Sequence, residues 1–297
     1  MSDPVAASFE GRPLPKPDEP VVDQGLQFDI TTMMGRRGLL ALLGGGLGAI
    51  SLAACGVPGT SAPAASGTAS SGATASSNLT EIPDETAGPY PADGSNGPDI
   101  LEQSGVVRRD IRSSFGTSTA KAAGVPMSLE LTIVDMAQHD APFAGVAVYA
   151  WHCTADGRYS LYSDGLTQEN YLRGVQVADA DGKVTFTSIV PGCYPGRWPH
   201  VHFEVYPDQA SITDASRAIA TSQVALPQAT CEAVYATDGY ARSAENLARL
   251  SLSTDSVFGD DGGASQLATV TGDASAGYAA SLRVGVDTTT QPSRSRR

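Results

Sequence analysis

Alternation of apolar and polar residues with a period of two is the feature that most constrains how this chain folds. The pattern starts at residues 127–133 and recurs at 146–148, 184–187, 201–205 and 266–286. Successive side chains of a β-strand point to opposite faces, so this period predicts strands with one buried face. Helical periodicity is confined to one short stretch, Ser243–Leu250. The sequence therefore predicts a mainly all-β domain, a β-sandwich with few short helices.

Composition divides the 297 residues into four parts. We expect a targeting segment at 1–55, a disordered linker at 56–82, a folded domain at 83–287 and a disordered tail at 288–297. The linker is rich in Gly, Ser, Ala, Thr and Pro and has no apolar period, so it cannot bury enough surface to offset its ordering entropy. The formal net charge of −13 argues against a nucleic-acid partner, because phosphate backbones require clustered Lys and Arg.

The targeting segment carries two consecutive signals. Arg36 and Arg37 precede a short, weakly apolar run, a pattern typical of twin-arginine export. The run ends at Leu52-Ala53-Ala54-Cys55, which resembles a bacterial lipobox with Cys55 as the lipidated residue. An ordinary cleavage site that happens to carry a Cys is the alternative. We therefore expect an exported lipoprotein, held at the cell surface through a lipid anchor in the membrane.

The densest group of reactive side chains lies between Trp151 and His202. His200 and His202 are two residues apart, so on a strand both imidazoles point to the same face and form a platform for a metal. Tyr159 and Tyr194 each follow a predicted turn that can bring a phenol beside the histidines. Taken singly, a His-x-His pair also occurs on solvated faces, and most tyrosines are packed aromatics with the hydroxyl at the surface.

Several blocks in this region occur in the order of a known signature. They are Trp151–Ser160, Tyr171–Gly174, Pro191–Tyr194 and Arg197–Phe203, preceded by Glu85–Tyr90 and Arg109–Ile111. Together they resemble the intradiol ring-cleavage dioxygenases, and the likeness covers roughly residues 83–287. The resemblance implies the β-sandwich of that family and the cleavage of a catechol-type aromatic ring by O2 to a muconate-type diacid.

The same resemblance assigns roles to individual residues. It implies Fe(III) bound by Tyr159, Tyr194, His200 and His202, with Tyr194 displaced when the diol binds as a dianion. Hard phenolate donors favour ferric iron, and imidazole also suits iron. Arg197 would stabilise negative charge on the ring, and Gln223 matches a family glutamine more loosely. Tyr171 does not match a ligand position. Trp198 is bulky at a position that is often small, and the turn from Tyr194 to His200 is short, so the likeness does not extend to the shape of the substrate pocket.

Two other functions compete with this interpretation. One is a non-catalytic β-sandwich lipoprotein that binds aromatic ligands or metal. The other is a cupin-type metal enzyme, which fits poorly because Glu204 follows His202 by only two residues. Cysteines suit an oxidising compartment, and with Cys55 lipidated we expect a disulfide between Cys153 and Cys231, which leaves Cys193 free beside the metal.

Overall fold

The computed structural model describes residues 8–9, 12–13 and 79–290. The predicted export signal, Cys55, nearly all of the predicted linker and the end of the predicted tail lie outside these residues. A short ladder pairs β1 (Ser8–Phe9) with β2 (Arg12–Pro13). Among the described residues, none of the helices has both the length and the apolar character needed to cross a membrane.

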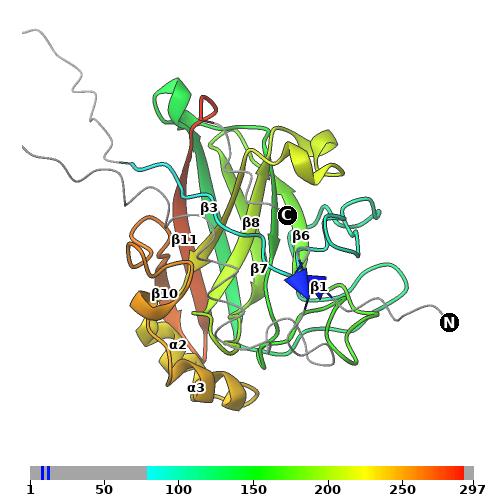
Figure 1. The fold of residues 1–297 in the computed structure, drawn as a ribbon, viewed down its shortest axis with the longest axis vertical. Coiled ribbons are helices and arrows are strands. Elements are labelled where there is room, and N and C mark those ends of the chain that lie inside the picture. The colour runs from blue at the N-terminus through cyan, green and yellow to red at the C-terminus, as the bar shows by residue number, and fades with distance from the viewer. Residues whose placement is uncertain (1–7, 10–11, 14–78, 291–297) are drawn as a thin grey trace, which may run out of the picture.

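Two sheets form the body of the fold (Figure 1). In the first sheet β10, β11, β3 and β4 are neighbours in that order, and β7 also pairs with β3. In the second sheet the order is β6, β5, β8 and β9. The strands are β3 (Pro126–Asp135), β4 (Ala141–Pro142), β5 (Ala147–Trp151), β6 (Arg173–Val177), β7 (Lys183–Ile189), β8 (His200–Tyr206), β9 (Ala220–Ala225), β10 (Thr269–Asp273) and β11 (Gly277–Val286).

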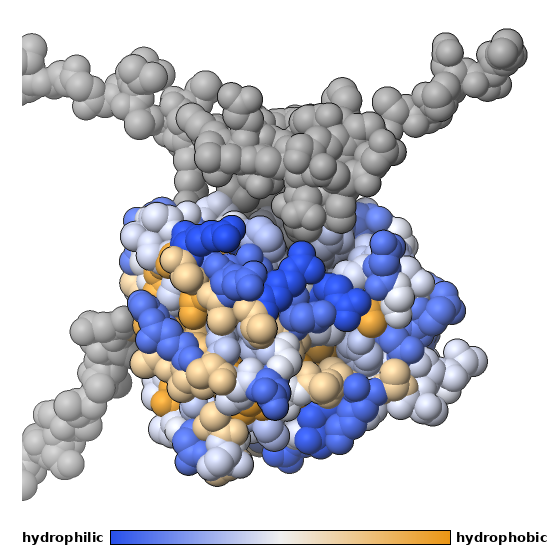
Figure 2. Space-filling model, turned by 90° about the horizontal axis from the view of Figure 1, so that it is seen from below, coloured by the Kyte–Doolittle hydropathy of each residue, from blue (hydrophilic) through white to orange (hydrophobic). Residues whose placement is uncertain are grey.

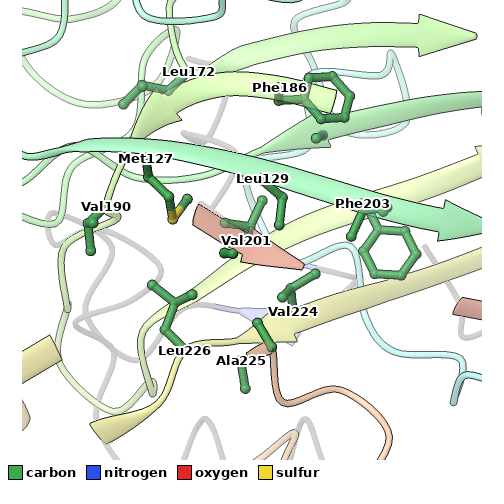
Figure 3. Packing of buried hydrophobic residues seen from close by; sticks show 14 of the residues in the cluster. Met127, Leu129, Leu172, Phe186, Val190, Val201, Phe203, Val224, Ala225 and Leu226 are labelled. Atoms are coloured by element: carbon green, nitrogen blue, oxygen red, sulfur yellow. The ribbon is translucent and has the colours of Figure 1, made fainter. Parts of the chain in front are cut away.

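The main core lies between the two sheets. Leu129 and Leu131 of β3 contribute to it from one sheet, and Val201 and Phe203 of β8 contribute from the other. Figure 3 shows the packing around Leu129, Val201 and Phe203, which alternate along their strands with side chains on the opposite face. As the period of two predicts, one face of each of these strands packs into the core of a β-sandwich.

The second sheet is buried on both faces, which explains why every residue of β5 and β8 is buried. Val148 of β5 faces the main core, whereas Tyr149 and Trp151 belong to a second cluster on the other face. Ile100 and Leu101, from the irregular segment that precedes β3, complete this second cluster. The imidazoles of β8 lie on this covered outer face, away from the main core.

The segment before β3 is fastened to both sheets. Val107 forms a bridge with Val175 of β6, and Asp110 forms a bridge with Thr187 of β7. The predicted boundary between linker and domain is too late, because Glu81 bridges to Gly285 of β11 and Ile82 is buried in the main core. Composition alone did not indicate that Ile82, at the end of a polar stretch, packs in the main core.

Helices are few and short. α2 (Gln228–Tyr235) and α3 (Ala241–Leu247) lie beside each other at the lower end of the strands in Figure 1, and α3 confirms the predicted helical stretch. Seen from that side, hydrophobic and hydrophilic residues are interspersed (Figure 2). Single 3-10 turns occur at η2 (Met136–Gln138), η3 (Gln209–Ser211), η4 (Ala215–Arg217) and η5 (Leu252–Thr254).

Candidate metal centre

Two histidines of β8 form the base of the site. His200 and His202 are both about 2% exposed, and their ring centroids lie 4.6 Å apart. Trp151, the partner of His202 in the β5–β8 ladder, stacks on its imidazole at 4.9 Å with an interplanar angle of 4°. Gly88 closes the other approach, since a Cβ there would lie 3.3 Å from His202 Cε1. These contacts fix the orientation of the His202 ring.

Two turns bring the tyrosines to the histidines. Tyr159 follows the turn at 154–158, and Tyr194 begins the turn that leads to β8. Gly157 allows the two turns to touch: it has a φ of +82°, and a Cβ there would lie 3.0 Å from the Cys193 carbonyl oxygen and 3.3 Å from Tyr194 Cβ. The rings of Tyr159 and Tyr194 then meet edge to face at 5.8 Å.

The polar atoms of the four rings converge. Tyr194 Oη lies 3.1 Å from His200 Nε2, which in turn lies 3.0 Å from His202 Nε2. His200 Nδ1 contacts the Trp198 carbonyl oxygen, and a carbonyl only accepts, so Nδ1 carries the proton and Nε2 presents its lone pair to the site. Tyr159 Oη is buried without a hydrogen-bond partner. The structure thus brings together all four predicted metal ligands.

The electrostatics of these groups fit a bound cation. Burial raises the pKa of Tyr159 well above its ordinary value and that of Tyr194 to about 12. Burial also lowers the pKa of His200 to about 3 and brings the pKa of His202 well below its usual range. Both imidazoles are therefore neutral and can offer a lone pair to a metal. The nearby Arg197 guanidinium lowers both phenol pKa values but does not offset burial, so ionisation of either phenol at neutral pH requires a further positive charge, such as a bound metal. Within the described residues no cluster of three His, Cys, Asp or Glu side chains could hold a metal, so the site depends on its tyrosines.

Arg197 and Gln223 lie next to the ring cluster. Arg197 Nη2 donates to Gln223 Oε1 at 2.5 Å, and Gln223 faces His202 in the β8–β9 ladder. Gln223 Nε2 donates to the Thr86 carbonyl oxygen at 3.0 Å, which attaches the N-terminal segment to the site. Arg197 Nε pairs with Asp255 at 3.0 Å. Arg197 and Gln223 therefore both lie next to the four rings. Arg197 is ion-paired with Asp255, and Gln223 is bonded to the Thr86 carbonyl oxygen.

Sequence reasoning missed several residues that shape the centre. Trp151 and Gly88 were part of the quoted motifs but had no assigned role, and Phe258 and Asp255 carried no signal at all. The ring of Phe258 lies 6.3 Å from the ring of His200 and 6.0 Å from Arg197 Cζ. An apolar or acidic residue more than fifty positions from its partner has no local pattern that reveals the contact.

Trp198 does not narrow the site. Its indole is buried in the main core, where Nε1 donates to the Leu226 carbonyl oxygen at 2.8 Å. There it lines a cavity of about 460 Å³ beside α2 and α3, to which Tyr235 and Leu247 also contribute. Tyr171 is likewise a residue of the main core, in agreement with its exclusion as a ligand.

The expected disulfide between Cys153 and Cys231 is wrong. Cys153, Cys193 and Cys231 are all free and buried in the described part of the chain. Cys153 belongs to the second cluster, where its thiol donates to the Gly192 carbonyl oxygen at 3.5 Å, whereas Cys231 belongs to the main core on α2. Burial raises the pKa of the Cys193 thiol to about 12, so this residue is a protonated core side chain next to Tyr194.

Comparison with known proteins places this geometry in context. The family described as Dioxygenase matches residues 96–206. Chlorocatechol 1,2-dioxygenase of Pseudomonas sp. (strain P51) is 36% identical over 86 residues, which are 23% of this chain and 34% of that protein. The chlorocatechol 1,2-dioxygenase of Rhodococcus opacus is 42% identical over 53 residues, 18% of this chain and 21% of that protein. The matches thus span about a third or less of these relatives.

A solved structure extends the likeness to a larger share of the chain. The intradiol ring-cleavage dioxygenase from Tetranychus urticae superposes with a TM-score of 0.58 at 21% sequence identity, over 72% of this chain and 98% of that one. The predicted type of β-sandwich is therefore confirmed. Residues 96–206 are thus similar to the dioxygenase family, and the domain has the fold of an intradiol ring-cleavage dioxygenase.

Proposed function

We propose that this protein is an Fe(III)-dependent enzyme that opens catechol-type rings between the two hydroxylated carbons and yields a muconate-type diacid. The observation that carries this proposal is the convergence of Tyr159, Tyr194, His200 and His202 beside Arg197. Catechol and O2 together contain all atoms of the diacid, so the reaction needs no further reductant. The relatives named chlorocatechol 1,2-dioxygenase support the substrate class.

The donor set matches ferric iron. Two phenolates and two neutral imidazoles are hard and borderline ligands that together offset two of the three positive charges of Fe(III). When bound, the iron would hold the diol through both oxygens and make its ring electron-rich enough to react with O2. The buried walls around His200 and His202 exclude bulk water from this site.

Tyr194 can act on protons as well as hold metal. Its Oη lies 3.1 Å from His200 Nε2, and Tyr194 stands at the start of the turn before β8 and not on a strand. With iron bound, an ionised Tyr194 would be a base for one catechol proton, and burial, which raises its pKa to about 12, would make it a strong one. Tyr159 and Tyr194 both belong to the second cluster, and Tyr159 is the less exposed of the two.

Arg197 supplies the positive charge at the ring. Its Nε donates to Asp255 and its Nη2 donates to Gln223. Among the described residues, Nη1 has no hydrogen-bond partner. A guanidinium fixed on two sides and free on the third can stabilise negative charge that develops on the substrate without reorganising. Loss of one such group typically costs on the order of a hundredfold in rate.

The test is product analysis. The full-length chain, loaded with Fe(III), is incubated with catechol, hydroxyquinol and protocatechuate under labelled O2, and products are identified by mass spectrometry. We expect a diacid that contains both labelled oxygen atoms. Arg197→Ala should keep the tyrosinate-to-iron colour and bind catechol with a spectral shift, yet turn over about a hundredfold more slowly.

Matched variants separate metal binding from folding. Tyr159→Phe should bleach or shift the colour, whereas Tyr171→Phe, which alters a tyrosine of the main core, should not. His202→Ala should abolish iron binding, and His139→Ala should retain it because His139 is exposed. A colourless protein with stoichiometric zinc or copper after growth in iron-rich medium would refute the metal assignment. Catechol binding with a colour change but no diacid would identify a binding module.

We also propose that the enzyme is exported and anchored through Cys55. The support is the Arg36–Arg37 pair and the lipobox-like sequence. Cys55→Ser should release the protein from membranes, and Arg36→Lys with Arg37→Lys should block export. Recovery of all wild-type protein as a soluble extracellular species would remove the anchor and leave the enzyme proposal intact.

A further inference from the structure

Asp255 lies at the centre of the hydrogen bonds that hold Arg197. Its side chain is 0% exposed. Asp255 directly follows η5 in the chain and lies outside the residues that match the dioxygenase family. Oδ2 accepts from Arg197 Nε at 3.0 Å and from the Trp198 amide at 2.6 Å. Oδ1 accepts from the amides of Val257 and Phe258 at 2.8 and 3.0 Å. All four donors point at one carboxylate.

This carboxylate is ionised in the folded protein. Burial alone raises the pKa of Asp255, but the Arg197 guanidinium and the amides of Trp198 and Phe258 bring it below its ordinary value. Charge-assisted hydrogen bonds of this kind are shorter and stronger than neutral ones. Asp255 thus holds two consecutive residues of the turn that joins Tyr194 to His200, one by its side chain and one by its backbone.

The other contacts of Arg197 leave one direction open. Gln223 engages Nη2, and the ring of Phe258 lies 6.0 Å from Cζ. Gln223 comes from β9 and Asp255 from the segment after η5, so two separate elements fix the guanidinium plane. The backbone amides bound by Oδ1 fix the carboxylate itself, which makes Asp255 a rigid support.

We propose that Asp255 is a positioning residue, which holds the Arg197 guanidinium where it can stabilise negative charge on the bound ring. This inference rests on the proposed function. A displacement of about 1 Å in a charge-stabilising group can cost on the order of a hundredfold in rate. Asp255 acts through Arg197, so its removal should lower kcat and leave diol binding largely intact.

The experiment compares Asp255→Asn with wild type and with Asp261→Asn. The amide keeps the size of Asp255 but loses the charge and one acceptor oxygen, so either the bonds from Arg197 and Trp198 to Oδ2 or the bonds from the Val257 and Phe258 amides to Oδ1 are lost. Asp261 lies in the same segment, and within the described part of the chain its carboxylate accepts from the nearby Gly263 and Ala264 amides and not from Arg197, which makes it a matched control. We expect a tenfold to hundredfold lower kcat for Asp255→Asn. The iron colour and the Kd for catechol, measured without O2, should change less than threefold. Asp261→Asn should match wild type.

A double-mutant cycle separates positioning from a general structural effect. If Asp255 acts through Arg197, Asp255→Asn in an Arg197→Ala background should lower kcat less than twofold further. A full additional loss in that background, or a wild-type kcat for Asp255→Asn, would overturn the proposal. Should Asp255→Asn fail to fold in a thermal melt, Asp255→Glu keeps the charge and shifts its position, and an unchanged kcat would then refute it. Wild-type turnover, measured first, reports separately on the proposed function.

Discussion

His152 provides a direct test of how burial couples to stability. Its side chain is 1% exposed, with Nδ1 at 2.8 Å from the Cys153 carbonyl oxygen and Nε2 at 2.7 Å from Ser188 Oγ. The carbonyl only accepts, so Nδ1 carries the proton and Nε2 accepts from the Ser188 hydroxyl. Burial lowers the pKa of His152 from 6.5 to about 4. The folded protein therefore favours the neutral ring.

The sign and size of the effect follow from this pKa. A folded-state pKa below the unfolded one gives a contribution that is complete above pH 6.5 and is lost as the pH falls toward 4. The full difference between the two pKa values corresponds to about 3 kcal/mol of unfolding free energy, of which about 2 kcal/mol should be lost at pH 5. Acidification should thus destabilise the fold before most carboxylates are protonated.

The assay is urea unfolding followed by circular dichroism at pH 7.5 and 5.0, with equal iron content in all samples. Wild type is compared with His152→Gln and with His139→Asn, which changes an exposed histidine. His200 and His202 are present in all three proteins, so their contributions cancel. We expect wild type and His139→Asn to lose about 2 kcal/mol more than His152→Gln between the two pH values. An equal loss in His152→Gln would refute the reasoning.

Three further substitutions test the packing. Tyr240→Phe removes a buried hydroxyl that accepts from the Val125 amide and donates to the Val190 carbonyl oxygen, so the unfolding free energy should fall by about 1–3 kcal/mol in denaturant titration. Phe186→Ala opens a cavity in the main core and should cost about 3–5 kcal/mol in the same assay. Gly157→Ala forces a left-handed residue against the turn of Tyr194, which should cost about 1–2 kcal/mol and weaken the iron absorbance. An unaltered spectrum would show that the two tyrosine turns move independently.

The strands that sequence predicted share one property, a clear alternation with one apolar face. β3, β7 and β8 have it, and each lies where expected. β6 and β9 were missed, because β6 starts with Arg173 and Gly174 and β9 reads Ala-Thr-Ser-Gln-Val-Ala. Other parts of the chain cover much of the outer face of both strands, so Arg173, Ser222 and Gln223 are buried although they are polar, and the alternation disappears.

Some residues of the candidate site could be predicted from the sequence, and others could not. The common face of His200 and His202 follows from strand geometry alone. Tyr159 and Tyr194 lie on turns, whose direction no periodicity specifies, so only the resemblance to a family identified them. Asp255 lies 58 residues from Arg197 along the chain and has no motif, so only the folded structure shows the pair.

The candidate metal centre, on the outer face of the second sheet, is supported by more of the chain than the residues that match the family. Residues 96–206 contain all four predicted ring ligands and Arg197. They lack Gly88 and the Thr86 carbonyl, which close the site from the N-terminal side, and they lack Gln223 on β9. They also lack β11, which pairs with β3 along nine residues, and Asp255. A fragment with these bounds would keep the predicted donor atoms but lose these supporting groups, so the geometry of this site depends on segments outside the residues that match the family.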